Sequence, residues 1–94
     1  MEQSEPAKSI SAENSALVVE QEEERRKLRR LQIMMSMVMS VISQDPDLTV
    51  EEASELVANA KRAALTMFPD KEFAYDILYK PRLQRLMAER FRLQ

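Results

Sequence analysis

Residues 31–43 read Leu-Gln-Ile-Met-Met-Ser-Met-Val-Met-Ser-Val-Ile-Ser, and this stretch decides how the chain folds. It holds four of the seven methionines in the protein. A helix through it is apolar over roughly 260° of its circumference, at about 100° per residue. Only a narrow polar seam remains, made of Gln32, Ser36, Ser40 and either Ser43 or Gln44. Such a helix has to be covered on several sides, so what covers it is the main functional question.

The composition of the chain points to an all-α fold. The 94 residues suffice for one domain, close to the lower size limit for a self-sufficient core. The sequence contains no glycine. Most β-hairpins, dinucleotide-binding turns and phosphate-binding loops need glycine for positive φ, so all three become unfavourable. Residues that favour helices dominate instead.

The missing residue types also bear on function. There is no cysteine and no histidine, so the usual ligands of zinc and the usual catalytic base are lacking. We therefore expect no metal, no cofactor and no enzymatic activity. A chain without cysteine fits a reducing compartment, and we expect a cytoplasmic protein. The apolar run is shorter than the roughly 20 residues of a transmembrane helix, and the net charge of −2 gives no general attraction to anionic membranes. We expect no membrane association.

The chain divides into a tail and one helical domain. Residues 1–14 are polar and unpatterned, which predicts a disordered tail, and residues 15–94 form the domain. A long first helix is predicted from about Ser15 to Ser43. The pair Glu22 and Arg26 supports its exposed half, because the two charges are four residues apart with the acid first. Asp45-Pro46 then ends the helix, because proline disfavours helical geometry in the residue before it.

The rest of the domain is predicted to contain two or three more helices. Thr49 and Glu52 form a capping box that starts the second one, whose apolar face has alanines at its centre: Ala53, Ala60 and Ala64. Small residues there predict a close approach of the methionine-rich segment. Two short helices follow, over 70–79 and 81–93, separated by Pro81, which suits a first helical turn. The expected architecture is a bundle of three to four helices.

The methionine-rich run admits three interpretations: the core of the monomer, a homo-oligomer interface, or an adaptable surface for a partner protein. The other helices are too short to cover it on all sides, so we expect part of it to be exposed and to bind. The most favoured function is therefore a non-enzymatic protein-interaction module that associates with itself or with a protein partner. We expect Met35 and Met39 to lie outermost. The predicted interface consists of Ile33, Met34, Met35, Met37, Val38, Met39 and Ile42.

The basic C-terminal segment supports an alternative function. Residues 80–94 carry five cations and one carboxylate, a net charge of +4. A basic stripe on one helix is typical of nucleic-acid binding, and the predicted contacts are Arg82, Arg85 and Arg92. The tyrosine pair Tyr75 and Tyr79 leaves two interpretations open: an exposed recognition surface, or partial burial against the first helix with the hydroxyls in water.

Overall fold

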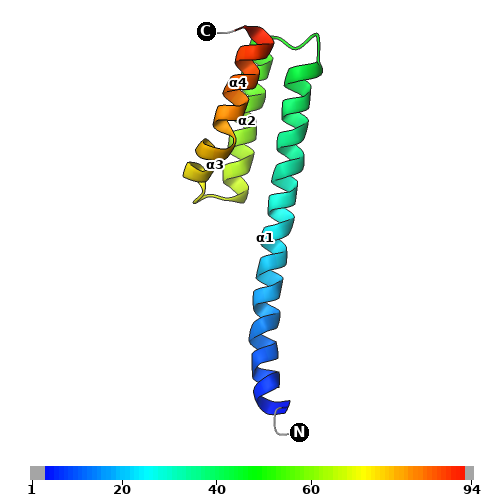
Figure 1. Ribbon diagram of the computed structural model, residues 1–94, viewed down its shortest axis with the longest axis vertical. Coiled ribbons are helices and arrows are strands. Elements are labelled where there is room, and N and C mark those ends of the chain that lie inside the picture. Colours follow the sequence, from blue (N-terminus) through cyan, green and yellow to red (C-terminus); the bar gives the residue numbers. More distant parts are fainter. Residues whose placement is uncertain (1–3, 93–94) are drawn as a thin grey trace. The chain divides into compact units, whose positions relative to one another are not determined.

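The computed structural model describes the backbone of residues 4–92 and the side chains of residues 14–92. Within this part of the chain the protein is all-α, as predicted from the sequence (Figure 1). Its helices are α1 (Ser4–Gln44), α2 (Val50–Met67), α3 (Glu72–Leu78) and α4 (Lys80–Phe91). The prediction of a long N-terminal helix followed by shorter ones is confirmed.

The backbone of α1 is helical from Ser4, earlier than the start expected near Ser15. Pro6 falls in the first turn, where its missing N–H has no helical partner to lose. Residues 1–3 and the side chains of residues 4–13 lie outside the described residues. The disorder expected for residues 1–14 therefore stays a prediction.

Two compact units make up the chain, Met1–Arg30 and Leu31–Gln94, and each is described by itself. In the first unit, the described side chains of residues 14–30 are exposed, apart from the half-buried Lys27. Glu22 and Arg26 form the predicted pair, with Oε2 and Nη2 3.7 Å apart. Both side chains are largely in solvent, so this pair contributes a few tenths of a kcal/mol at most.

The second unit begins with residues 31–44 of α1, which are followed by a tight turn. The Oδ1 atom of Asp45 accepts a hydrogen bond from the backbone N–H of Asp47 at 3.0 Å. The carbonyl oxygen of Asp45 accepts another from Nη2 of Arg90 at 2.7 Å, which ties the turn to α4. Figure 1 shows that α2 runs antiparallel to residues 31–44 after this turn, and that α4 runs antiparallel to α2.

The capping box predicted at the start of α2 is confirmed. The backbone N–H of Glu52 donates to Oγ1 of Thr49 at 3.1 Å, and the backbone N–H of Thr49 donates to Oε1 of Glu52 at 2.9 Å. Two amides that the helix leaves without internal partners are satisfied in this way.

The core of the second unit lies between residues 31–44, α2, α3 and α4. The alanine face of α2 is buried as predicted, with Ala53, Ala60 and Ala64 each no more than 3% exposed. The other buried residues are Leu31, Met35, Ile42, Tyr75 and Leu83.

The predicted close approach of the methionine-rich segment to α2 is wrong. Among the described residues, no Cα atom of residues 31–44 lies within 8 Å of a Cα atom in another helix, whereas α2 comes that close to α3 and α4. The α1 side chains that enter the core are large, including Met35 and Ile42, and large side chains keep two helix axes apart.

Candidate functional site: an apolar strip on α1 and a groove between α2 and α4

The methionine-rich segment is split between core and surface. Met35 and Ile42 are 1% and 0% exposed, so these two predicted interface residues belong to the core of the second unit. Ile33 and Met37 are exposed, at 53% and 63%. The remaining predicted interface residues are half-buried: Met34, Val38 and Met39.

The expectation that Met35 and Met39 lie outermost is wrong. At about 100° per residue, Met35 and Met37 point about 160° apart around the helix, so the burial of one exposes the other. The exposed line consists of Ile33, Met37 and Val41, spaced by four residues, and Val41 was missed by the sequence reasoning. We call these three residues the α1 strip.

A sequence signal for the buried face of α1 was present. Leu28, Leu31, Met35, Val38 and Ile42 are spaced by three, four, three and four residues, the heptad spacing of helices that pack along one seam. Of these residues, Leu31, Met35 and Ile42 are buried in the second unit. The α1 strip lies on the other side of the helix.

The polar seam of α1 faces arginines of α4. Arg82 and Arg85 are exposed and line a shallow groove of mixed polar and apolar character, together with Ser36, Ser40 and Ser43 of α1 and the side chains of Met39 and Leu86. Glu89 and Gln44 also line this groove, so the cations share it with a carboxylate. Two of the predicted nucleic-acid contacts are thus brought together.

The other basic residues of the C-terminal segment are placed differently. Arg92 is exposed and follows the end of α4, in a left-handed conformation with φ of 55°. Arg90 donates to the carbonyl of Asp45, and its guanidinium lies 4.9 Å from the ring centroid of Phe91. Arg90 therefore stabilises the turn before α2.

Helix α3 buries its tyrosine side and exposes its most apolar side. Tyr75 is 6% exposed and stacks at a tilt on the half-buried Tyr79, with 5.6 Å between the ring centroids. The exposed recognition surface is therefore wrong, and Tyr75 is buried more fully than the other interpretation expected, because its hydroxyl is buried as well. Phe73, Ile77 and Leu78 are 78%, 56% and 60% exposed. We call these three the α3 patch. The sequence reasoning did not single it out as a surface.

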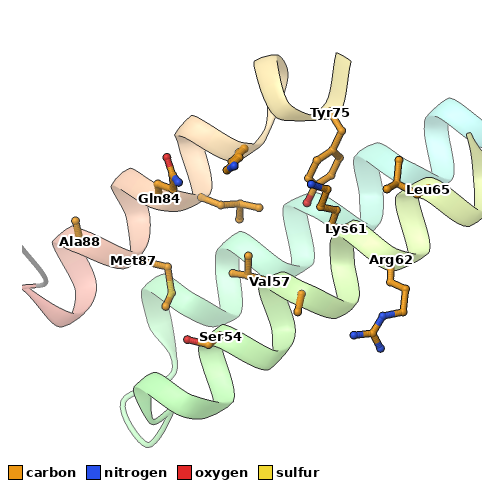
Figure 2. A pocket seen from close by; sticks show the side chains of 12 residues that line it. Ser54, Val57, Lys61, Arg62, Leu65, Tyr75, Gln84, Met87 and Ala88 are labelled. Atoms are coloured by element: carbon orange, nitrogen blue, oxygen red, sulfur yellow. The ribbon is translucent and has the colours of Figure 1, made fainter. Parts of the chain in front are cut away.

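A groove of about 700 Å³ lies between α2 and α4, and Tyr75 of α3 also lines it. Figure 2 shows Val57 of α2 and Met87 of α4 on opposite walls of this groove. Its lining is mostly apolar, and three cations take part in it: Lys61, Arg62 and Lys80. No carboxylate is among the residues that line it.

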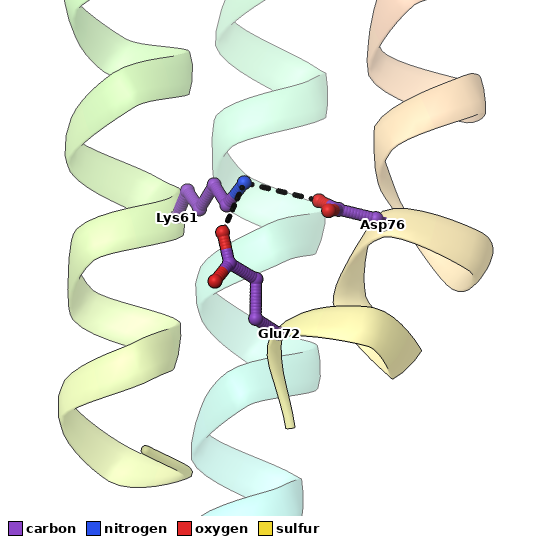
Figure 3. A network of polar contacts seen from close by, with 3 residues as sticks. All are labelled: Lys61, Glu72 and Asp76. Atoms are coloured by element: carbon purple, nitrogen blue, oxygen red, sulfur yellow. Dashed lines mark ion pairs between the residues drawn. The ribbon is translucent and has the colours of Figure 1, made fainter. Parts of the chain in front are cut away.

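One of the three cations is already paired within the chain. The Nζ atom of Lys61 lies 3.1 Å from Oε2 of Glu72 and 3.1 Å from Oδ1 of Asp76 (Figure 3). Hydrogen bonding to Asp76, and then to Glu72, raises the pKa of Lys61 above its ordinary value of 10.5. The two pairs join α2 to α3 and hold the end of the groove.

Tyr75 places a polar atom at this end of the groove. Among the described residues its buried hydroxyl has no hydrogen-bond partner. Burial raises the pKa of Tyr75 above its ordinary value of 10.0, and the nearby Lys61 acts in the opposite direction. A buried hydroxyl without a partner is unusual and calls for an explanation.

Two further kinds of feature are a metal-ligand cluster and a membrane-spanning helix, and neither is found in the described part of the chain. No three carboxylates there come close enough together to hold a metal ion, and no described helix is long and apolar enough to cross a membrane. No protein-family model matches the sequence, and neither a curated protein nor a solved structure is found to be similar to it.

Proposed function

We propose that this chain is a non-enzymatic protein-interaction module of the cytoplasm, which associates with itself or with a protein partner through the methionine-rich segment of α1. The observation that carries the proposal is the α1 strip, in which Ile33, Met37 and Val41 keep 53%, 63% and 39% of their surface exposed. Three large apolar side chains on consecutive turns make a continuous apolar line, whereas exposed apolar residues scattered singly need no explanation.

The chemistry of the strip suits binding to another helix. Residues four apart lie one above another on a helix, so a partner helix packing along α1 contacts all three residues. Met37 at its centre is unbranched and flexible, and such side chains adapt to the shape of a partner. The core residue Met35 points away from this surface, so a partner binds without opening the bundle.

The test compares Met37→Glu with the matched control Gln32→Glu. Both changes place one carboxylate on an exposed position of the same helix, but only Met37 belongs to the α1 strip. Sedimentation equilibrium over a range of protein concentrations measures association, and circular dichroism checks that both variants stay helical. We expect Met37→Glu to abolish association while Gln32→Glu leaves it intact. If the two variants associate equally well, or the wild type stays monomeric and binds neither a hydrophobic dye nor a partner from its host, the proposal fails.

A second candidate function is nucleic-acid binding by α4. It is favoured by the groove in which Arg82 and Arg85 lie beside three serines, because arginine and hydroxyl side chains are common phosphate contacts. Glu89 in the same groove opposes it. A gel shift with random duplex DNA at several salt concentrations tests it. The logarithm of the affinity falls linearly with the logarithm of the salt concentration. If both arginines contact phosphates, their replacement by alanine makes this dependence less steep, by about 1.8 in slope.

A further inference from the structure

The α1 strip is symmetric about its central residue. Ile33 and Val41 lie four residues before and after Met37, and all three side chains are exposed. A two-fold axis beside Met37 therefore brings Ile33 of each chain opposite Val41 of the other, so that the strip pairs with an identical strip. We propose that two copies of this chain pair antiparallel along their α1 strips. The pairing rests on the proposed function, for which it names the partner as a second copy.

The surroundings of the strip are neutral. Residues 31–44 contain no charged side chain. The exposed Ser40 and Gln44 lie beside the strip and are polar without carrying charge. Burying an unpaired charge is costly, so a neutral strip favours a partner whose contact surface is neutral as well. The same surface on a second copy meets this requirement.

The segments at the two ends of residues 31–44 carry opposite charges. Residues 25–30, directly before this stretch in the sequence, contain five cations and no carboxylate. Residues 45–55, directly after it, contain five carboxylates and no cation. Arg90, which donates to the carbonyl oxygen of Asp45, and Arg92, two residues further on, offset only part of this negative charge. The end of the second unit at the turn after α1 is therefore acidic.

This distribution of charge selects the antiparallel direction. In a parallel pair the two acidic ends meet each other, and so do the two basic segments, which opposes association. In the antiparallel pair, Arg29 comes opposite Asp45 of the other copy, because both residues lie eight positions from Met37. The cations of residues 25–30 thus reach the turn that holds Asp45 and the exposed Asp47. Both repulsions become attractions.

The rest of the second unit leaves this contact open. Met35 is buried among the other helices, and Met37 points about 160° away from it around α1. Figure 1 shows α2, α3 and α4 together on one side of residues 31–44. Two strips therefore meet with the other helices of each copy on the outer sides of the pair.

The contact is small, which sets the expected affinity. From Ile33 to Val41 the strip extends about 12 Å at 1.5 Å per residue. Three apolar side chains and their neighbours fall short of the roughly 20–30 residues that each partner contributes to a stable interface. We therefore expect a weak dimer, with a dissociation constant on the order of 10 μM to 1 mM. The experiments need protein concentrations that cover this range.

Disulfide cross-linking tests the direction of the pairing. The chain contains no cysteine, so an introduced cysteine is the only thiol of each full-length variant. Ile33→Cys and Val41→Cys are oxidised separately and as an equimolar mixture. Met37→Cys is the positive control, and Gln32→Cys is the matched control at an exposed position of α1 outside the strip. Circular dichroism checks that each variant is folded, and mass spectrometry identifies the products.

We expect the mixture of Ile33→Cys and Val41→Cys to form the mixed disulfide, whereas each variant alone forms almost none. The reason is that a disulfide needs Cβ atoms roughly 3.5–4.5 Å apart, so it joins only residues that lie opposite each other. Met37→Cys should cross-link with itself, because the two-fold axis passes beside it, and Gln32→Cys should not cross-link. A parallel pair would give the opposite result, with each variant cross-linking to itself and no mixed disulfide.

Charge reversal tests the contact between the oppositely charged ends. Asp47→Lys changes an exposed carboxylate in the turn after α1, and Asp70→Lys makes the same change at an exposed position between α2 and α3. Sedimentation equilibrium at low and high salt gives the dimer dissociation constants. We expect Asp47→Lys to weaken the dimer by a factor of roughly 2–30 at low salt, because two exposed charge contacts are lost. This factor should shrink at high salt, and Asp70→Lys should not weaken the dimer.

Four results overturn the antiparallel pairing, and they separate it from the proposed function. A wild type that is monomeric at millimolar concentration, but binds another protein of its host in a way that Met37→Glu abolishes, refutes the pairing and leaves the proposed function standing. Cross-linking of Ile33→Cys or Val41→Cys to itself, without the mixed disulfide, has the same meaning. Equal dissociation constants for Asp47→Lys and Asp70→Lys also refute the pairing. If the wild type dimerises and Met37→Glu leaves the dimer intact, both the pairing and the proposed function fail.

Discussion

Truncation of two methionines tests which side of α1 faces the bundle. Met35→Ala and Met37→Ala remove the same atoms from the same helix, only two residues apart. Met35 is 1% exposed and Met37 is 63% exposed, so the two changes should differ greatly in their effect on the free energy of unfolding. This difference decides whether the α1 strip is a surface.

The expected magnitudes follow from burial. Replacing a fully buried methionine by alanine costs about 2–5 kcal/mol, because apolar contacts are lost and a cavity is left. The same change at an exposed position usually alters stability by no more than about 0.5 kcal/mol. In a domain of this size, about 1 kcal/mol corresponds to roughly 4–8 °C in melting temperature. Met35→Ala should therefore lower the melting temperature by at least about 8 °C, and Met37→Ala by less than about 4 °C.

Urea unfolding followed by circular dichroism measures the free energy of unfolding of both variants, at a protein concentration low enough to avoid association. Thermal unfolding under the same conditions gives their melting temperatures. The midpoint should shift in Met35→Ala with little change in slope. Met35→Leu is the control for volume, and it should cost less than about 1.5 kcal/mol. If Met37→Ala instead proves the more damaging of the two, then α1 presents its other face to the core. The assignment of the α1 strip would then be refuted.

Four further outcomes are expected. Thr49→Ala should cost about 1 kcal/mol in chemical unfolding, because it removes the hydroxyl that accepts a hydrogen bond from the backbone N–H of Glu52, and a silent change would place the start of α2 elsewhere. Ala60→Leu should destabilise the protein by roughly 1–3 kcal/mol, because residue 60 is 3% exposed, and a neutral result would move that face to solvent. The free energy of unfolding should fall as the pH rises above about 10. The reason is that Lys61 and Tyr75 have raised pKa values in the folded state, so the unfolded state loses these protons at a lower pH. In Tyr75→Phe, the free energy of unfolding measured as a function of pH should fall less above about pH 10. Deletion of residues 1–14 should leave the melting temperature unchanged if they form a disordered tail, and a clear fall would show that they pack.

The sequence by itself determined the local structure of the second unit. The Asp45-Pro46 stop, the capping box of Thr49 and Glu52 and the break before Pro81 were all predictable, because each depends on residues within one helical turn of each other. The burial of Ala53, Ala60 and Ala64 was predictable for a similar reason, since the period of apolar residues along one helix identifies its core face.

Only the tertiary structure decided which apolar side chains are left for a partner. Met35 and Met37 are chemically identical, and a run that is apolar nearly all round does not show which side a neighbouring helix covers. In α3 the bundle buries Tyr75 and leaves Phe73 in solvent, against the order of their hydrophobicity. The groove between α2 and α4 joins residues up to 34 positions apart in the sequence, from Ser54 to Ala88. Which side of a helix is buried depends on where the helices distant in sequence lie. The reason is that apolar surface is removed from water only where two or more elements come into contact. The candidate binding surfaces are what that packing leaves uncovered, so they become visible only when the helices are placed together.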